Sequence, residues 1–208
     1  SKSKYIIESP KDYCGKWNSV FDNDNPIHVE VGMGKGNFII DKALKNPNIN
    51  YIGCEISQSI IYKAAKETVN IPNLLLLNYD AFKLEECFSE GEIDKIYLTF
   101  SDPWPKSRHE KRRLTADAFL NVYKNILIKD GVVEFKTDNR DLFDFAVEEL
   151  EPAGWKAEVI TYDLHADEKL VEGNIMTEYE RNFSERGMKI NMLRITKPSG
   201  FNPEVAPE

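Results

Sequence analysis

Residues 28–40 of the chain read HVEVGMGKGNFII, and this stretch decides the fold. It begins as a β-branched run that is typical of a buried strand, breaks at three glycines spaced two apart, and resumes with helical periodicity. A turn without Cβ atoms lets a ligand lie against backbone N–H groups at a helix N-terminus, where partial positive charge is concentrated. Strand, glycine turn and helix together predict a nucleotide-type ligand site.

The glycine turn matches neither of two well-known phosphate-binding motifs. The phosphate-binding loop requires Ser or Thr after its lysine, but Lys35 is followed by Gly36. The dinucleotide fingerprint G-x-G-x-x-G fails because Asn37 stands where its third glycine is required. What remains is E-x-G-x-G-x-G starting at Glu30, with Glu55 at the end of the next strand-like run. A carboxylate in that place suits a ribose diol, because it accepts two hydroxyl hydrogen bonds.

Strand and helix patterns alternate along the rest of the chain. Further strands are predicted at 51–55, 74–79, 96–100 and 131–135, each followed by a helical stripe, and a terminal pair at 157–162 and 189–196 encloses an acidic loop. This order predicts an α/β fold with a doubly wound, mostly parallel sheet of seven strands and a terminal antiparallel strand. The predicted organisation is an irregular N-terminal segment (1–26), one domain (27–197) and a C-terminal tail (198–208).

An acidic residue lies at the carboxyl end of each of the first five predicted strands of that domain. In a doubly wound sheet this edge binds the ligand. One acid at such a place is commonly a helix N-cap, but five at successive strand ends favour a site. They are Glu30, Glu55, Asp80, Asp102 and Asp138.

Composition and charge bound the other possibilities. The 208 residues, 41% of them apolar, are enough for one core, and no apolar run approaches the roughly 18 residues of a membrane span. With no basic-then-apolar leader pattern, the prediction is a soluble, cytoplasmic protein without a membrane partner. The three cysteines and three histidines are scattered, so no metal site is expected.

The net charge of −8 at first argues against a nucleic-acid partner, but the charge is unevenly distributed. Residues 141–185 hold thirteen acidic side chains against three basic ones, a net −10, so the rest of the chain carries +2. Within that remainder, one short stretch forms a basic patch whose cations are Lys106, Arg108, Lys111, Arg112 and Arg113. We therefore expect local contact with nucleic-acid phosphates.

The segment Asp102-Pro103-Trp104-Pro105 follows the strand at 96–100. Two prolines around a tryptophan stiffen the backbone and place an acid and an indole at low entropic cost. The simpler interpretation is a rigid loop with a packed indole. The segment also resembles the Asp/Asn-Pro-Pro-aromatic motif with which several methyltransferases hold a nitrogen nucleophile, with one proline displaced.

Two levels of resemblance follow from these motifs. The run Glu30 to Gly36 with Glu55 resembles the S-adenosylmethionine site of Rossmann-like methyltransferases. Together with the stretches 103–113, 137–138 and 177–183, it resembles the bacterial tRNA (guanine-N7-)-methyltransferase family, whose substrate is guanine 46 of the variable loop; the likeness covers residues 5–197. Family members usually carry a longer basic N-terminus than residues 1–26 provide.

The resemblance implies S-adenosyl-L-methionine as cofactor, tRNA as partner, and a monomer or weak homodimer. The implied cofactor contacts are Glu30, Gly32, Gly34, Gly36, Glu55, Asp80 and Asp102. The implied substrate contacts are Lys106, Asp138, Thr177, Glu178, Tyr179 and Glu180, and the RNA contacts are Arg108, Lys111, Arg112 and Arg113.

The implied reaction is compatible with these residue types. Guanine N7 has a free lone pair and no proton, so in-line attack on a sulfonium methyl requires no general base. Asp102 is then expected to orient the base and to stabilise the developing positive charge. Three alternatives stay open: a nicotinamide-dependent oxidoreductase, a non-catalytic RNA-binding module, and a methyltransferase acting on another nitrogen.

Overall fold

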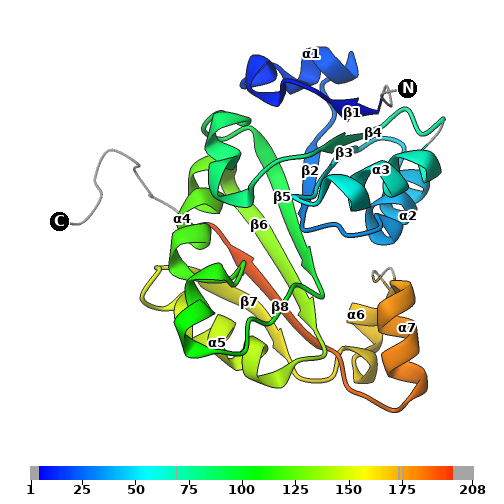
Figure 1. Ribbon diagram of the computed structural model, residues 1–208. Coiled ribbons are helices and arrows are strands. Elements are labelled where there is room, and N and C mark those ends of the chain that lie inside the picture. The colour runs from blue at the N-terminus through cyan, green and yellow to red at the C-terminus, as the bar shows by residue number, and fades with distance from the viewer. Residues whose placement is uncertain (1–4, 69, 173, 175, 199–208) are drawn as a thin grey trace.

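The computed structural model describes residues 5–68, 70–172, 174 and 176–198. Within these residues, eight strands form one sheet in the order β1-β4-β3-β2-β5-β6-β8-β7 (Figure 1). The strands β1 to β8 span, in order, Ile6–Ile7, Ile27–Val31, Asn50–Cys54, Leu74–Leu77, Ile93–Thr99, Leu127–Thr137, Lys156–Thr161 and Asn191–Thr196. The helices α1 to α7 span Trp17–Phe21, Asn37–Lys45, Gln58–Glu67, Asp117–Ile126, Arg140–Leu150, Glu168–Glu172 and Glu178–Glu185. The short 3-10 helices η1 to η4 span Pro10–Tyr13, Ala81–Glu86, Ser107–Arg112 and Leu164–Ala166.

The strand directions confirm the predicted doubly wound sheet. Neighbouring strands from β1 to β6 pair in parallel, whereas β8 is antiparallel to both β6 and β7. The chain moves outward from β2 through β3 to β4 and then returns to β5 on the other side of β2. The order therefore reverses between β2 and β5, and a ligand is expected beyond the carboxyl ends of these two strands.

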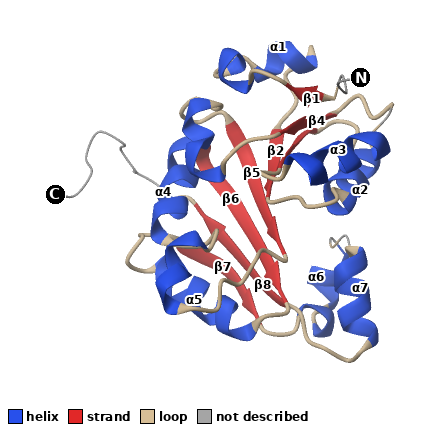
Figure 2. Ribbon diagram, in the orientation of Figure 1, coloured by secondary structure: helices blue, strands red, loops and turns tan. Residues whose placement is uncertain are grey.

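Successive side chains of the strands enter two different cores. In β3, Tyr51 packs with Phe38 and Ile61 from α2 and α3, whereas its neighbour Ile52 belongs to the core on the opposite face with Phe119 of α4. This alternation follows from the strand period of two. Figure 2 shows the consequence, since α2 and α3 lie on one side of the sheet and α4 and α5 on the other.

The structure differs from the predicted elements in two places. The sheet has one strand more than the expected seven. The additional strand is β1, which lies in the N-terminal segment expected to be irregular and pairs with β4. A run of two isoleucines is too short to show a period. The loop expected between the last two strands contains η4, α6 and α7, which are short and predominantly polar in sequence.

The N-terminal segment packs against the sheet. Trp17 of α1 is fully buried, and its indole N–H donates to the Cys87 carbonyl over 2.8 Å. None of the described helices has the length and apolarity to cross a bilayer. The same residues contain no group of three metal-ligating side chains. The division at residues 26 and 197 stays a prediction.

Candidate active site

The glycine turn joins β2 to α2 in a conformation that requires glycine. Gly32, Gly34 and Gly36 have φ angles of 73°, 56° and 82°, in the left-handed region that L side chains rarely adopt. Gly36 is the N-cap residue of α2. Between the glycines, Met33 points inward and is buried against Gly53 of β3. Met33 therefore anchors the turn on the side that faces β3, and the opposite side of the turn is left for a ligand.

Glu55 ties this turn to the end of β3. Its carboxylate accepts hydrogen bonds from the Gly34 amide over 3.1 Å and from the Ser57 amide over 2.8 Å. Each oxygen takes one of these bonds, so each keeps a lone pair for a further donor. The prediction that Glu55 lies at the carboxyl end of the second strand is confirmed, and its side chain reaches the turn.

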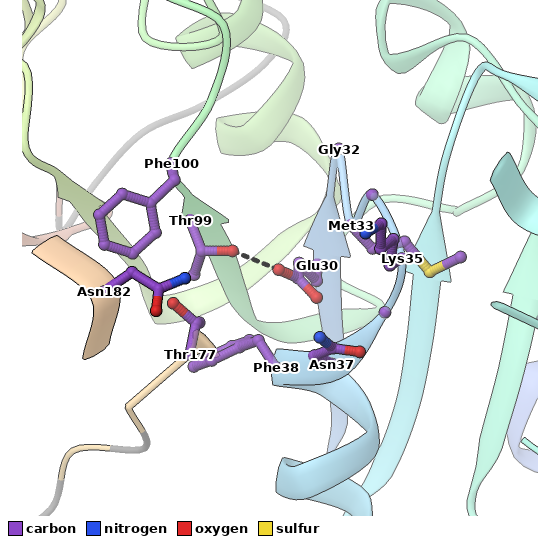
Figure 3. A pocket seen from close by; sticks show the side chains of 12 residues that line it. Glu30, Gly32, Met33, Lys35, Asn37, Phe38, Thr99, Phe100, Thr177 and Asn182 are labelled. Carbon is purple, nitrogen blue, oxygen red and sulfur yellow. Dashed lines mark hydrogen bonds between the residues drawn. The ribbon is translucent and has the colours of Figure 1, made fainter. Parts of the chain in front are cut away.

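Glu30 is a buried carboxylate with only one of its oxygens paired. It is 1% exposed, and its Oε1 accepts a hydrogen bond from the Thr99 hydroxyl (Figure 3). Its Oε2 has no hydrogen-bond partner among the described residues. Burial raises the pKa of Glu30 to about 8. A buried acceptor in this state is costly unless a donor or a cation reaches it.

Two cavities adjoin at the glycine turn, and Gly32, Gly34 and Phe100 belong to the walls of both. We call the first, of about 360 Å³, the Glu30 cavity. We call the second, of about 390 Å³, the Asp80 cavity. The Glu30 cavity is lined on its other sides by Glu30, Met33, Lys35, Gly36, Asn37, Phe38, Thr99, Thr177 and Asn182. The Asp80 cavity is further lined by Val31, Cys54, Glu55, Ile56, Ile60, Tyr79, Asp80, Ala81, Ser101, Asp102, Trp104, Arg112, Leu114 and Phe119.

The two aspartates of the Asp80 cavity are held differently. Asp80 caps η2, since its carboxylate accepts from the Phe82 amide over 3.0 Å. Asp102 is exposed and lies in the loop after β5. This loop contains two non-glycine residues in the left-handed region, Phe100 at φ 52° and Trp104 at φ 43°.

The basic patch forms η3 beside this loop. Lys106, Arg108, Lys111 and Arg112 are exposed. The Arg112 guanidinium lies 5.0 Å from the centroid of the Trp104 ring and contributes to the wall of the Asp80 cavity. Arg113, in contrast, is buried.

Helix α7 forms the far wall of the Glu30 cavity. Figure 3 shows Asn182 of this helix and Thr177, the residue that precedes it, on the side of the cavity near Thr99 and Phe100. Thr177 also caps the helix, because its hydroxyl oxygen accepts from the Glu180 amide over 2.9 Å. The side chains of Glu178 and Tyr179, two of the predicted substrate contacts, lie outside the described residues.

Glu180 of α7 is fully buried and forms an ion pair with Lys136 of β6. The Lys136 ammonium donates to Glu180 over 2.7 Å, and Glu180 also bonds His165 and Asn174, both over 2.8 Å. Burial acts to raise the pKa of Glu180, but Lys136 together with the hydrogen bonds from His165 and Asn174 holds this pKa below its usual range. Lys136 was not predicted from the sequence. The only available signal was a lysine next to the apolar run that ends at Phe135.

The structure thus brings part of the predicted set together. Of the predicted contacts, Glu30, Gly32, Gly34, Gly36, Glu55, Asp80, Asp102, Thr177 and Arg112 line the two cavities. Lys106, Arg108, Lys111, Arg113, Asp138 and Glu180 line neither. Asp138 is not a helix cap either, because the side chain of Asn139 caps α5.

Comparison with known proteins identifies the family. A family profile described as "Putative methyltransferase" matches residues 24–193. A tRNA (guanine-N(7)-)-methyltransferase of Lachnoclostridium phytofermentans is 51% identical over 195 residues, covering 93% of this chain and 91% of that protein. The chain belongs to the tRNA (guanine-N(7)-)-methyltransferase family.

Other relatives of the family agree in extent. A protein of the same name from a Geobacillus species is 46% identical, covering 94% of this chain and 89% of its own length. Another from Bacillus licheniformis is 49% identical, covering 90% of this chain and 88% of its own length. Solved structures show the fold. An antibiotic-related methyltransferase superposes with a TM-score of 0.68 at 18% identity, covering 94% of this chain and 98% of its own. The 16S rRNA methyltransferase KamB superposes with a TM-score of 0.64 at 15% identity, covering 88% of this chain and 94% of its own. The methyltransferase fold expected from the glycine turn is therefore confirmed.

Proposed function

We propose that this protein transfers the methyl group of S-adenosyl-L-methionine to N7 of guanine in tRNA, at the variable-loop guanine 46. The observation that carries the proposal is a pair of adjoining cavities on the glycine turn, in a chain half identical to enzymes of that name. We propose that the protein acts as a monomer or weak homodimer. We place this tRNA modification in the cytoplasm.

The described residues fit the cofactor on both sides of the glycine turn. In the Asp80 cavity, Glu55 would accept the ribose hydroxyls and Asp80 the exocyclic amine of adenine. Apolar side chains of the same cavity would cover the two faces of the adenine, and they are Ile56, Ile60, Leu114 and Phe119. In the Glu30 cavity, the unpaired Oε2 of Glu30 would take the ammonium of the methionyl end.

The bound cofactor would supply a methyl group on a positively charged sulfur. The protein's own task is to hold guanine N7 in line with that methyl group, and positioning of this kind can contribute about 7–11 kcal/mol. No general base is required, because N7 carries no proton. Asp102 would orient the purine and stabilise the positive charge that develops on it, acting as charge partner and not as proton acceptor.

The base would enter from the side of α7. Thr177 already faces the Glu30 cavity, and carboxylates suit the N1–H and N2 amine of guanine, which are donors. We assign this recognition to Asp138 and to Glu178 with Tyr179, and assign Lys106 to the adjoining phosphate. Because Glu180 is buried in its ion pair with Lys136, we propose that it supports this wall from beneath.

The exposed cations of η3 would hold the tRNA backbone. Arg108, Lys111 and Arg112 lie on one short helix next to the Asp80 cavity. Contacts of this kind are sequence-independent and sensitive to salt. Trp104, which Arg112 covers, would stack on a splayed base.

Transfer of labelled methyl to an unmodified tRNA transcript tests the proposal. A second transcript replaces the variable-loop guanine with adenine, and chemistry that cleaves at 7-methylguanine locates the label. Label in the first transcript alone, released by that cleavage, is the expected result. Equal label in both transcripts would discard the site, and no label in either, with cofactor binding intact by calorimetry, would discard tRNA as the acceptor.

A further inference from the structure

Arg113 differs from every other cation of the basic patch in its surroundings. It is 8% exposed, whereas Lys106, Arg108, Lys111 and Arg112 are exposed. Its guanidinium lies 4.4 Å from the centroid of the Phe145 ring on α5. An arginine packed against an aromatic ring at this burial cannot present its charge to a phosphate without leaving its site.

The donors of Arg113 go to the backbone of the loop that carries Asp102. Its Nε donates to the Pro103 carbonyl over 3.0 Å, and its Nη2 donates to the Trp104 carbonyl over 3.2 Å. Its third nitrogen, Nη1, lies 3.8 Å from the Glu110 carboxylate. One planar fork therefore holds two consecutive carbonyl groups, which a single ammonium cannot reproduce.

This loop needs external support. Phe100 and Trp104, which lie on either side of Asp102, both adopt left-handed backbone conformations that persist only where the surroundings fix them. Pro103 and Pro105 have no N–H, so the loop cannot hold itself by regular backbone pairing. Its carbonyl groups still require donors where they are buried, and Arg113 provides them.

We propose that Arg113 is a positioning residue, which fixes the Asp102–Trp104 loop at the wall of the Asp80 cavity and does not contact tRNA phosphates. The inference deepens the proposed function, on which it rests for the identity of the reaction. It separates the basic patch into four residues that face solvent and one that faces the loop. Replacement of Arg113 should therefore act on turnover and cofactor binding, and leave the salt dependence of tRNA binding unchanged.

The test compares Arg113→Lys with two matched variants. Arg108→Gln removes an exposed cation of η3, the helix that Arg113 follows. Arg194→Lys changes a hydrogen-bonded arginine of β8, which pairs with Glu134 and lines neither cavity. Three quantities are measured for each: kcat on tRNA, cofactor affinity by calorimetry, and the slope of log K for tRNA binding against log salt.

For Arg113→Lys we expect kcat to fall by about 10–100-fold, as small misplacements of an active-site group do, and cofactor affinity to fall with it. The salt slope should equal that of the wild type. Arg108→Gln should reduce the slope by about 0.7–0.9, the value for one phosphate contact. Arg194→Lys should leave all three quantities unchanged.

A second variant keeps the inference testable if Arg113→Lys folds poorly. Phe145→Leu removes the ring beneath the guanidinium and keeps the charge, and we expect a smaller loss of kcat with an unchanged salt slope. A reduced slope with normal kcat in Arg113→Lys would show a phosphate contact. A lowered melting temperature with normal kcat, cofactor affinity and slope would show a purely structural role. Failure of the wild type to methylate tRNA would refute the proposed function, while the calorimetric arm would still decide the role of Arg113.

Discussion

Glu30 shows how one buried side chain prepares a site for a charged ligand. In the folded protein its pKa is raised to about 8 by burial, whereas in the unfolded chain it titrates near 4.5. The folded state therefore retains a proton that the unfolded chain loses, and stability falls as the pH rises between these two values. A cation at Oε2 would reverse this effect, because it favours the ionised carboxylate.

Glu30→Gln tests this account. We expect the variant to lose the decline in unfolding free energy between about pH 4.5 and 8 that the wild type shows in chemical denaturation. Cofactor binding to the wild type near pH 7 should release part of a proton, seen as a buffer-dependent enthalpy in calorimetry. For the variant we expect the same enthalpy of cofactor binding in all buffers. A proton release equal to that of the wild type would show that Glu30 does not bind the ammonium group.

Asp102→Asn tests the charge role of the loop after β5. The amide keeps the shape of the side chain but removes its negative charge, so the developing positive charge on guanine loses a partner. We expect the single-turnover rate to fall by about 10²-fold while cofactor affinity changes less. Near-normal single-turnover rates with bound cofactor would contradict this role.

At the scale of elements, the glycine turn depends on the absence of a side chain at one position of the neighbouring strand. A Cβ built on Gly53 of β3 would lie 2.3 Å from the Met33 sulfur. Gly53→Ala should therefore push Met33 out and displace the turn, with a loss of cofactor affinity of about tenfold or more. The double variant Gly53→Ala/Met33→Ala should recover part of that affinity, and purely additive losses in this cycle would show that the contact does not couple the two residues.

Helix α7 depends on the buried ion pair between Lys136 and Glu180. Lys136→Met leaves a buried carboxylate uncompensated, so we expect a loss of about 3–5 kcal/mol of unfolding free energy. Lys136→Met/Glu180→Gln removes both charges and should regain most of it. Denaturant titration of the single and double variants measures the coupling, and equal losses in both would show that Lys136 acts through other contacts.

Elements with a clear period were predictable, and those without one were not. The runs at β2 to β6 and the stripes of α2 to α5 stand out because burial on one or two faces dictates the residue type. The two isoleucines of β1 and the short, mostly polar helices α6 and α7 offer too few apolar residues for such a signal. The acids at strand ends were predictable because topology places them at one edge. The Lys136–Glu180 pair was not, because it joins residues 44 positions apart, and the Arg113 contacts were not, because they depend on the irregular backbone of the Asp102–Trp104 loop.

At the scale of the whole molecule, an acidic protein with one basic helix should bind tRNA through few phosphate contacts. The four exposed cations around η3 predict a slope of log K against log salt of about −3, from 0.7–0.9 per contact. Binding measured from 50 to 300 mM salt gives this slope. A slope near zero would place the tRNA elsewhere, and a much steeper one would require cations outside this patch.

The location of α6 and α7 has a consequence for how such enzymes diversify. Both helices are inserted between β7 and β8, whereas the glycine turn and the strand-end acids around the Asp80 cavity come from the first half of the chain. On the proposed assignment, the guanine contacts at the start of α7 and the cofactor contacts of the Asp80 cavity therefore come from separate stretches of the chain. The Lys136–Glu180 ion pair links the two stretches, because Lys136 belongs to β6 and Glu180 to α7. A related enzyme that received the segment with α6 and α7 would therefore need a lysine at the same place in β6 to pair with Glu180.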